Sequence, residues 1–137
     1  MNKHRSFIAA TAIFVVYTFV TALGWHLVVF DGYYRTLEIY RDDKIIPFGF
    51  AAILVQGVVL AYLYPRIFPS GCALRNGLKF GLLAGLFGWT YSTLAVAAKF
   101  SMTSVPGFVL IETGYNIVHY GLAGPLMAMA YNKSTET

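Results

Sequence analysis

The stretch SFIAATAIFVVYTFVTALGWHLVVF, residues 6–30, runs for 25 residues without an Asp, Glu, Lys or Arg. A helix needs roughly 20 apolar residues to cross the hydrocarbon core of a bilayer. Residues 45–65 and 80–98 form two more such stretches, of 21 and 19 residues. A fourth, residues 100–132, carries only Glu112 in 33 residues. The sequence therefore predicts four membrane-spanning helices.

The composition of the 137-residue chain is typical of a membrane protein. Hydrophobic residues make up 58% of it and charged residues only 12%, with a mean hydropathy of +0.63. Soluble domains carry about 25% charged residues, and a domain this small has too little interior to bury so much apolar surface. We therefore expect the lipid bilayer to surround most of the chain.

The charged residues are spread over the expected helix ends. Because the net charge of +4 comes without a basic cluster, phospholipid headgroups are the expected partners, and nucleic acid is not. Lys and Arg number six in the two tails and the second loop, against four in the other two loops. This excess favours cytoplasmic termini. We also expect a multi-pass protein of the inner (cytoplasmic) membrane. The single cysteine, Cys72, excludes an internal disulfide.

The expected architecture is an all-α integral membrane protein, a four-transmembrane-helix bundle with short loops that forms one domain over residues 1–137. The start MNKHRS is basic, as in signal peptides, but the apolar stretch after it is too long for one, so we expect this helix to be retained. The spans are expected at about residues 7–30, 47–64, 78–98 and 107–131, with an interfacial segment at about 31–46.

The interfacial segment DGYYRTLEIYRDDKII, residues 31–46, repeats large apolar side chains at helical spacing. Tyr33, Leu37 and Tyr40 would share one face, with charged residues pointing elsewhere. The pattern fits a short amphipathic helix on the bilayer surface. It fits equally an aromatic belt at the end of the first span.

Glycines repeat in the third span, within GLKFGLLAGLFGW. Gly77, Gly81 and Gly85 recur every four residues, and Gly88 lies beside this line. Small residues at this spacing let helix backbones approach closely in lipid. The pattern predicts helix packing, either inside the bundle or with a second copy of the chain.

Five polar residues inside the spans are the candidate site: His26, Gln56, Glu112, Asn116 and His119. At about 1.5 Å of rise per residue, His26 and Glu112 fall at similar depth and His119 lies near the midplane. Ionisable groups in lipid normally face the bundle interior or a water-filled cavity. We expect these residues to line a polar pocket that opens outward, with His26 and Glu112 paired across two helices.

Three interpretations of this pocket stay open. Polar pairs between membrane helices often only hold the helices together. A functional pocket or proton path would use Glu112 as the titrating group and His119 as the inner relay. A metal or haem site is the third, but His119 lies about 10 Å deeper than His26 and Glu112, and the Glu-x-x-His spacing of known metal helices is absent. We expect no metal and no cofactor.

The sequence also lacks catalytic motifs. It contains no Gly-rich phosphate loop, no G-x-S-x-G elbow and no cysteine pair. Ser92 and Thr93 could be placed beside His26 as nucleophile and base, but hydroxyls in membrane helices usually bond their own backbone. We therefore expect no catalytic residue.

Two stretches, KIIPFGFAAILVQGVVLAYLYP (residues 44–65) and LRNGLKFGLLAGLFGW (residues 74–89), resemble small four-span bacterial membrane proteins without an assigned function. The resemblance concerns architecture over nearly the whole chain, and it transfers no site residue. The expected function is that of a small non-enzymatic membrane protein, a subunit, assembly factor or structural partner, in a larger complex or a homo-oligomer through the third span. A transporter or proton-conducting element is the alternative, and a membrane-embedded haem or metal protein is the third.

Overall fold

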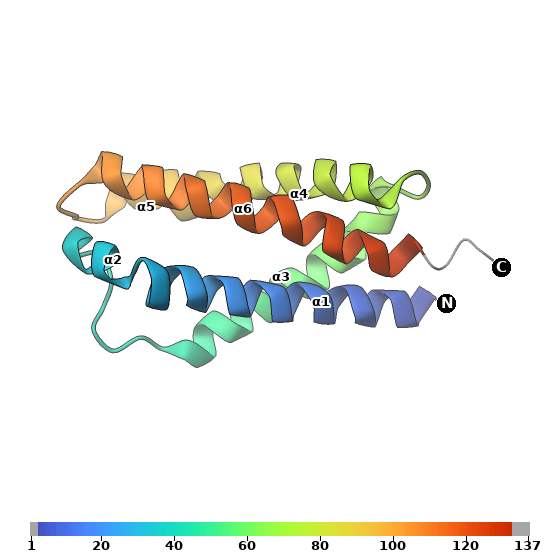
Figure 1. Ribbon diagram of the computed structural model, residues 1–137, viewed down its shortest axis with the longest axis horizontal. Coiled ribbons are helices and arrows are strands. Elements are labelled where there is room, and N and C mark those ends of the chain that lie inside the picture. Colours follow the sequence, from blue (N-terminus) through green and yellow to red (C-terminus); the bar gives the residue numbers. More distant parts are fainter. Residues whose placement is uncertain (1–2, 133–137) are drawn as a thin grey trace.

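The computed structural model describes residues 3–132, and over these residues its regular structure is helical throughout (Figure 1). Two wide π-helical turns, η1 and η2, continue α1 and α4 without a break. The elements in chain order are α1 (Lys3–Leu23), η1 (Gly24–Val29), α2 (Asp31–Leu37), α3 (Ile46–Ile67), α4 (Ala73–Trp89), η2 (Thr90–Leu94), α5 (Ala95–Lys99) and α6 (Val105–Asn132).

Three helical stretches are long and apolar enough to cross a membrane. They are Lys3–Val29, Ile46–Ile67 and Ala73–Lys99, of 27, 22 and 27 residues. The prediction of a helical chain with apolar spans is confirmed to this extent. The fourth long helix, α6, has 28 residues and carries Glu112 and His119 among other polar residues, and it is not one of these three stretches.

The long helices lie side by side along one axis, as Figure 1 shows. The beginning of α1, the end of α6 and the connection between α3 and α4 lie together at what we call the terminal end. Helix α2 and the connection between α5 and α6 lie at the opposite end, the cap end. Helix α4 packs mainly against α6, and α1 packs against both α6 and α3.

The contact between α4 and α6 depends on glycines. A Cβ atom on Gly77 would lie 2.6 Å from the Cα atom of Pro125, and one on Gly81 would overlap the carbonyl oxygen of Tyr120. On α6, a Cβ atom on Gly124 would likewise overlap the carbonyl oxygen of Gly77. These glycines therefore bring α4 and α6 of the same chain into backbone contact.

Further along this contact, α4 meets Tyr120 of α6. A Cβ atom on Gly85 would lie 2.9 Å from the Cβ of Tyr120, and one on Gly88 would lie 3.3 Å from its hydroxyl oxygen. All four glycines predicted to pack helices thus face α6.

The main apolar core lies near the terminal end and is shared by α1, α3, α4 and α6. Phe80 of α4 belongs to it and is 3% exposed.

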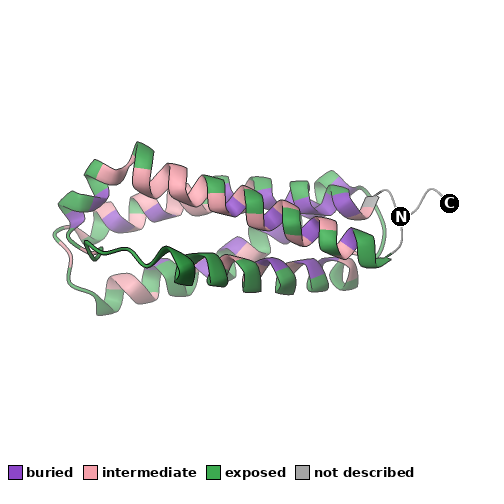
Figure 2. Ribbon diagram, turned by 90° about the horizontal axis from the view of Figure 1, so that it is seen from below, coloured by how far each residue is buried: buried purple, intermediate pink, exposed green. Residues whose placement is uncertain are grey.

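Helices α1 and α3 touch only over part of their length. At the point of contact, a Cβ atom on Gly57 would lie 3.0 Å from Cγ2 of Val15 and 3.2 Å from Cδ1 of Phe14. Toward the cap end, residues 46–55 of α3 are exposed apart from the half-buried Ile53, and Figure 2 shows this part of the helix in green. Helix α3 therefore diverges from the bundle as it approaches the cap end.

At the cap end, α2 closes the bundle over a second apolar cluster. Tyr34 and Leu37 are each 1% exposed and pack with Phe108 of α6. The backbone N–H of Thr103 donates to the carbonyl oxygen of Leu37 at 3.1 Å, which ties α2 to the α5–α6 connection. The inward side chain of the first turn is thus Tyr34, whereas Tyr33 is 41% exposed.

Candidate functional site: a carboxylate beneath two tyrosines

Glu112 of α6 lies at the centre of a polar cluster near the cap end, and it is only 8% exposed. The hydroxyl of Tyr34 donates a hydrogen bond to its Oε1 atom at 2.7 Å, and the hydroxyl of Tyr40 approaches the same oxygen at 3.5 Å. The Nε2 atom of His26 lies 3.3 Å from this oxygen as well. We call these four residues the Glu112 cluster. It joins η1, α2, the segment after α2 and α6.

Local backbone features bring the three partners to Glu112. The π-helical turn η1 carries His26, and its wide hydrogen bond runs from the N–H of Phe30 to the carbonyl oxygen of Trp25, five residues back. Glu38 ends α2 in the left-handed conformation, with φ of 57°. The chain reverses there, and Tyr40 returns to stack on Tyr34 with ring centroids 5.0 Å apart.

The contact between His26 and Glu112 requires one proton. The Nδ1 atom of His26 lies 3.0 Å from the carbonyl oxygen of Ala22, which can only accept, so Nδ1 carries a hydrogen. In a neutral imidazole Nε2 is then an acceptor, and it faces a carboxyl oxygen. A hydrogen bond between them needs a further proton, held on the imidazole or on the carboxyl group.

The two tyrosines act as donors to this pair. Burial raises the pKa of Tyr34 above the ordinary tyrosine value, and the neighbouring Glu112 carboxylate raises it further. Burial and Glu112, in the same order, also raise the pKa of Tyr40. Both hydroxyls therefore keep their protons at neutral pH and point them toward Glu112.

His119 lies one layer further from the cap end and does not contact Glu112 directly. Its ring is stacked between those of Tyr17 and Tyr115, at centroid distances of 5.7 and 5.2 Å. Its Nδ1 atom lies 3.4 Å from the hydroxyl of Thr21, which donates its own proton to the carbonyl oxygen of Tyr17. Thr21 is thus an acceptor for an N–H on His119.

Tyr115 connects His119 to the cluster. Its ring meets that of His26 edge-on, with centroids 4.5 Å apart, and it stacks on His119 on its other side. The result is a continuous row of rings that leads from Tyr34 through His26 and Tyr115 to His119.

The other two predicted residues lie elsewhere. Asn116 is half-buried and faces α4, where it lines a hollow of about 270 Å³ with Gly85 and Trp89. Gln56 is half-buried on α3, and within residues 3–132 it makes no hydrogen bond to the Glu112 cluster. Of the five predicted residues, the structure brings His26 and Glu112 into contact, adds His119 through Tyr115, and places the other two apart.

A polar hollow of about 500 Å³ lies above the cluster at the cap end. Tyr34 and Tyr40 form part of its lining, so they stand between the hollow and Glu112. The remaining lining residues are three acids and three bases, Asp31, Arg35, Glu38, Arg41, Asp42 and Lys44. Arg35 is held by Asp31 at 2.7 Å, and Arg41 by Asp43, which lies outside the hollow, at 2.9 Å.

Sequence reasoning missed Tyr34 and Tyr40 as partners of Glu112. A signal for Tyr34 was present, because Tyr34 and Leu37 are three residues apart and so share one face of a short helix. No pattern indicated the reversal at Glu38 that returns Tyr40 to the cluster.

The described residues contain no group of three or more His, Cys, Asp and Glu side chains that could hold a metal ion. No protein-family model, curated protein or solved structure matches this chain.

Proposed function

We propose that this chain is a small non-enzymatic integral protein of the cytoplasmic membrane, acting as a subunit, assembly factor or structural partner through its cap end. The observation that supports this most is the mixed-charge hollow directly above the Glu112 cluster. Three acids and three bases around one concavity offer both signs of charge to a partner. Complementary charges at an interface fix its register and exclude wrong partners.

The buried Glu112 cluster holds the segments that line the hollow in place. Because one carboxylate oxygen contacts side chains from η1, α2 and the segment after α2, these elements are held together on α6. A partner that docks on a preformed surface loses less conformational entropy on binding than one that must order a loop.

The proposal includes four spans with cytoplasmic termini, α6 being the fourth. Its 28 residues would cover about 42 Å at 1.5 Å per residue, which exceeds the hydrocarbon thickness. Exposed Cys72 lies between α3 and α4 at the terminal end and provides a natural test. A membrane-impermeant thiol reagent should label it in inside-out vesicles but not in right-side-out ones.

The matched control moves the thiol to the other end. In a Cys72→Ser, Ser101→Cys variant the thiol lies in the connection between α5 and α6, so the labelling pattern should reverse. Labelling of both variants from the same side would contradict a single span, formed by α4 and its continuation, between residues 72 and 101.

The partner itself is testable by photo-crosslinking in the native membrane. A crosslinking amino acid at Arg35, in the hollow, should capture a larger polypeptide, whereas one at Leu110, which is 76% exposed on α6, should not. The proposal fails if neither position captures a protein and the chain migrates alone in mild detergent.

One observation favours a second function, a transporter or proton-conducting element. The contact between His26 and Glu112 lies next to the row of rings that reaches His119. In that case Glu112→Gln should abolish pH-dependent uptake in liposomes, while Asp43→Asn, outside both the hollow and the cluster, should leave it intact. Unchanged flux in Glu112→Gln would remove this alternative.

A further inference from the structure

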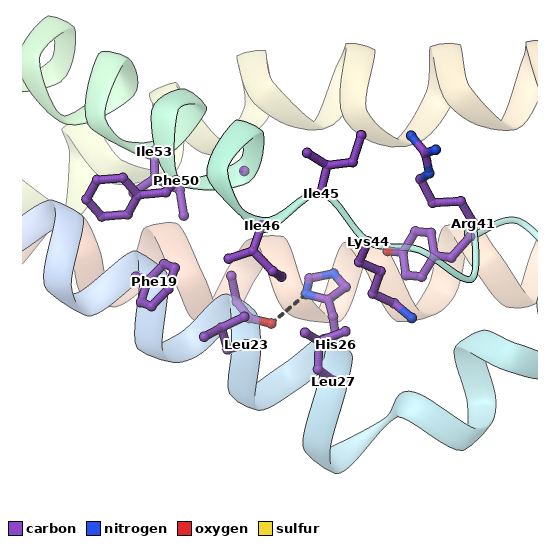
Figure 3. A pocket seen from close by; sticks show the side chains of 13 residues that line it. Phe19, Leu23, His26, Leu27, Arg41, Lys44, Ile45, Ile46, Phe50 and Ile53 are labelled. Atoms are coloured by element: carbon purple, nitrogen blue, oxygen red, sulfur yellow. Dashed lines mark hydrogen bonds between the residues drawn. The ribbon is translucent and has the colours of Figure 1, made fainter.

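A lateral groove runs between α1 and α3 on the side of the molecule where these helices diverge (Figure 3). Its volume of about 380 Å³ falls within the roughly 300–1,000 Å³ range of small-molecule sites. Most of its lining is apolar, including Phe19, Leu23, Leu27, Phe50 and Ile53.

The groove exists because α1 and α3 diverge beyond Gly57. A Cβ atom on Gly57 would meet side chains of α1, and Phe19 and Phe50 still meet edge-on with ring centroids 5.6 Å apart. A Cβ atom on Gly49, however, would have nothing within 4 Å. The space therefore widens toward the cap end and opens sideways, into what would be the hydrocarbon region if α1 and α3 span the membrane.

The wall of the groove offers no free imidazole nitrogen. His26 lines it, but its Nδ1 atom bonds the carbonyl oxygen of Ala22 and its Nε2 atom lies against Glu112. Figure 3 shows the first of these contacts. The hydroxyl of Tyr40, which also lines the groove, points to Glu112 as well, so the wall offers an occupant mainly apolar surface.

Two cationic side chains, Arg41 and Lys44, line the mouth of the groove, and they differ in whether a carboxylate pairs with them. Arg41 is held by both carboxylate oxygens of Asp43, at 2.9 and 3.0 Å, and its guanidinium points away from His26 in Figure 3. Lys44 takes part in none of the salt bridges among residues 3–132. It lies two residues before α3 begins, at the boundary where a membrane span meets lipid headgroups.

From this arrangement we infer that the α1–α3 groove holds one acyl chain of a phospholipid, with the phosphate of that lipid bound to Lys44. An apolar slot that opens to the hydrocarbon region accepts the chain, and a lysine at the headgroup level attracts the anionic phosphate. This binding does not depend on a protein partner at the cap end.

Native mass spectrometry of the full chain, extracted with its lipids into mild detergent, tests the inference. The wild-type chain should retain one phospholipid, and adding diacylglycerol, which has the chains but no phosphate, should not displace it. Lys44→Gln should weaken retention about fivefold, the effect expected from one lysine near an anionic lipid. Gly49→Leu should abolish retention by filling the groove.

Two matched variants control for charge and size. Lys99→Gln removes a lysine from the same end of the bundle but outside the groove, and Gly121→Leu adds the same side chain where nothing lies within 4 Å of the Cβ. Both should retain the lipid as the wild type does.

Three outcomes would overturn the inference. They are a wild-type chain that retains no phospholipid, equal retention in all four variants, and a loss in Gly49→Leu without one in Lys44→Gln. The last would mean that the groove holds an apolar molecule whose phosphate, if any, is not on Lys44. None of these outcomes bears on crosslinking at Arg35, so the two proposals fail separately.

Discussion

The helix pairs α4–α6 and α1–α3 both contain glycine, yet only the first pair stays in contact along its length. In α4–α6, Gly77 and Gly81 face the backbone of α6, and Gly124 faces back toward α4. In α1–α3, Gly57 packs against side chains of α1 and Phe50 meets Phe19 edge-on, but Gly49 faces open space. Close approach therefore requires a small residue opposite a backbone at each successive turn, and glycine alone does not produce it.

The two pairs also differ in what holds their cap-end halves. Where α3 has left α1, α1 and η1 still contact α6. Thr21 and Tyr17 meet His119, and His26 meets Glu112. Polar and aromatic contacts to α6 thus hold α1 at the level where packing with α3 is loose. The following substitutions would test this difference, in order of decreasing effect.

Gly81→Leu should be the most damaging change. A Cβ atom there would overlap the carbonyl oxygen of Tyr120, and backbone cannot move aside without separating α4 from α6. We expect a loss at or above the upper end of the roughly 1–3 kcal/mol caused by overpacking. Denaturant unfolding in mild detergent, followed by the fluorescence of Trp89, would measure it.

Gly121→Leu is the control for size and lipophilicity, because its Cβ atom would have nothing within 4 Å. If Gly81→Leu does not assemble, Gly81→Ala introduces the same overlap with a single methyl group. Equal stabilities for Gly81→Ala and Gly121→Ala would show that the α4–α6 contact is not as close as described.

Glu112→Leu should have the next largest effect. It leaves the buried hydroxyl of Tyr34 and the Nε2 atom of His26 without their partner, at a cost of about 1–3 kcal/mol. Glu112→Gln should cost only about 1 kcal/mol, because its amide can still satisfy one of the two groups. Unfolding followed by Trp25 in a Trp89→Phe background would compare them. A leucine variant as stable as the glutamine variant would refute the role of this carboxylate in holding α1.

Gly57→Leu should have a smaller effect than either. The two nearest atoms that its Cβ would meet belong to the side chains of Val15 and Phe14, and the nearest backbone atom, the oxygen of Thr11, is at an ordinary contact distance of 3.4 Å. We therefore expect a loss near the lower end of roughly 1–3 kcal/mol. Gly49→Leu, in the open part of the same pair, should stay within about 0.5 kcal/mol of the wild type. The same unfolding measurement ranks them, and a loss in Gly57→Leu equal to that in Gly81→Leu would contradict the distinction between the pairs.

The sequence was sufficient to predict a helical chain with long apolar helices, because the cost of burying charge in lipid keeps most Asp, Glu, Lys and Arg residues out of such stretches. The first span was expected at about residues 7–30, and α1 with η1 runs over Lys3–Val29. The proximity of His26 and Glu112 also followed from their similar depth. Depth comes from counting residues along a helix, and helical rise is nearly constant.

The direction in which a side chain points was harder to predict. Asn116 follows Glu112 by four residues, a rotation of about 40° on a regular helix, and this is enough to turn it toward α4 while Glu112 faces α1 and α2. The divergence of α3 left no periodic signal either. Its exposed half is as apolar as its buried half, because lipid and protein interior favour the same residues.

The wide turns η1 and η2 have a consequence for chain length. A hydrogen bond that spans five residues encloses one residue more than the hydrogen bond of an α-helix. Each wide turn therefore contains one residue more than a regular α-helical turn would. Deleting the exposed Val28 within η1 should therefore let the turn become regular and leave α2 in place. Deleting the exposed Val16 in α1 should instead rotate everything beyond it by about 100°, and the folding yields of the two deletions would compare them. Natural versions of this protein that differ by one residue in length are thus expected to differ at these two turns.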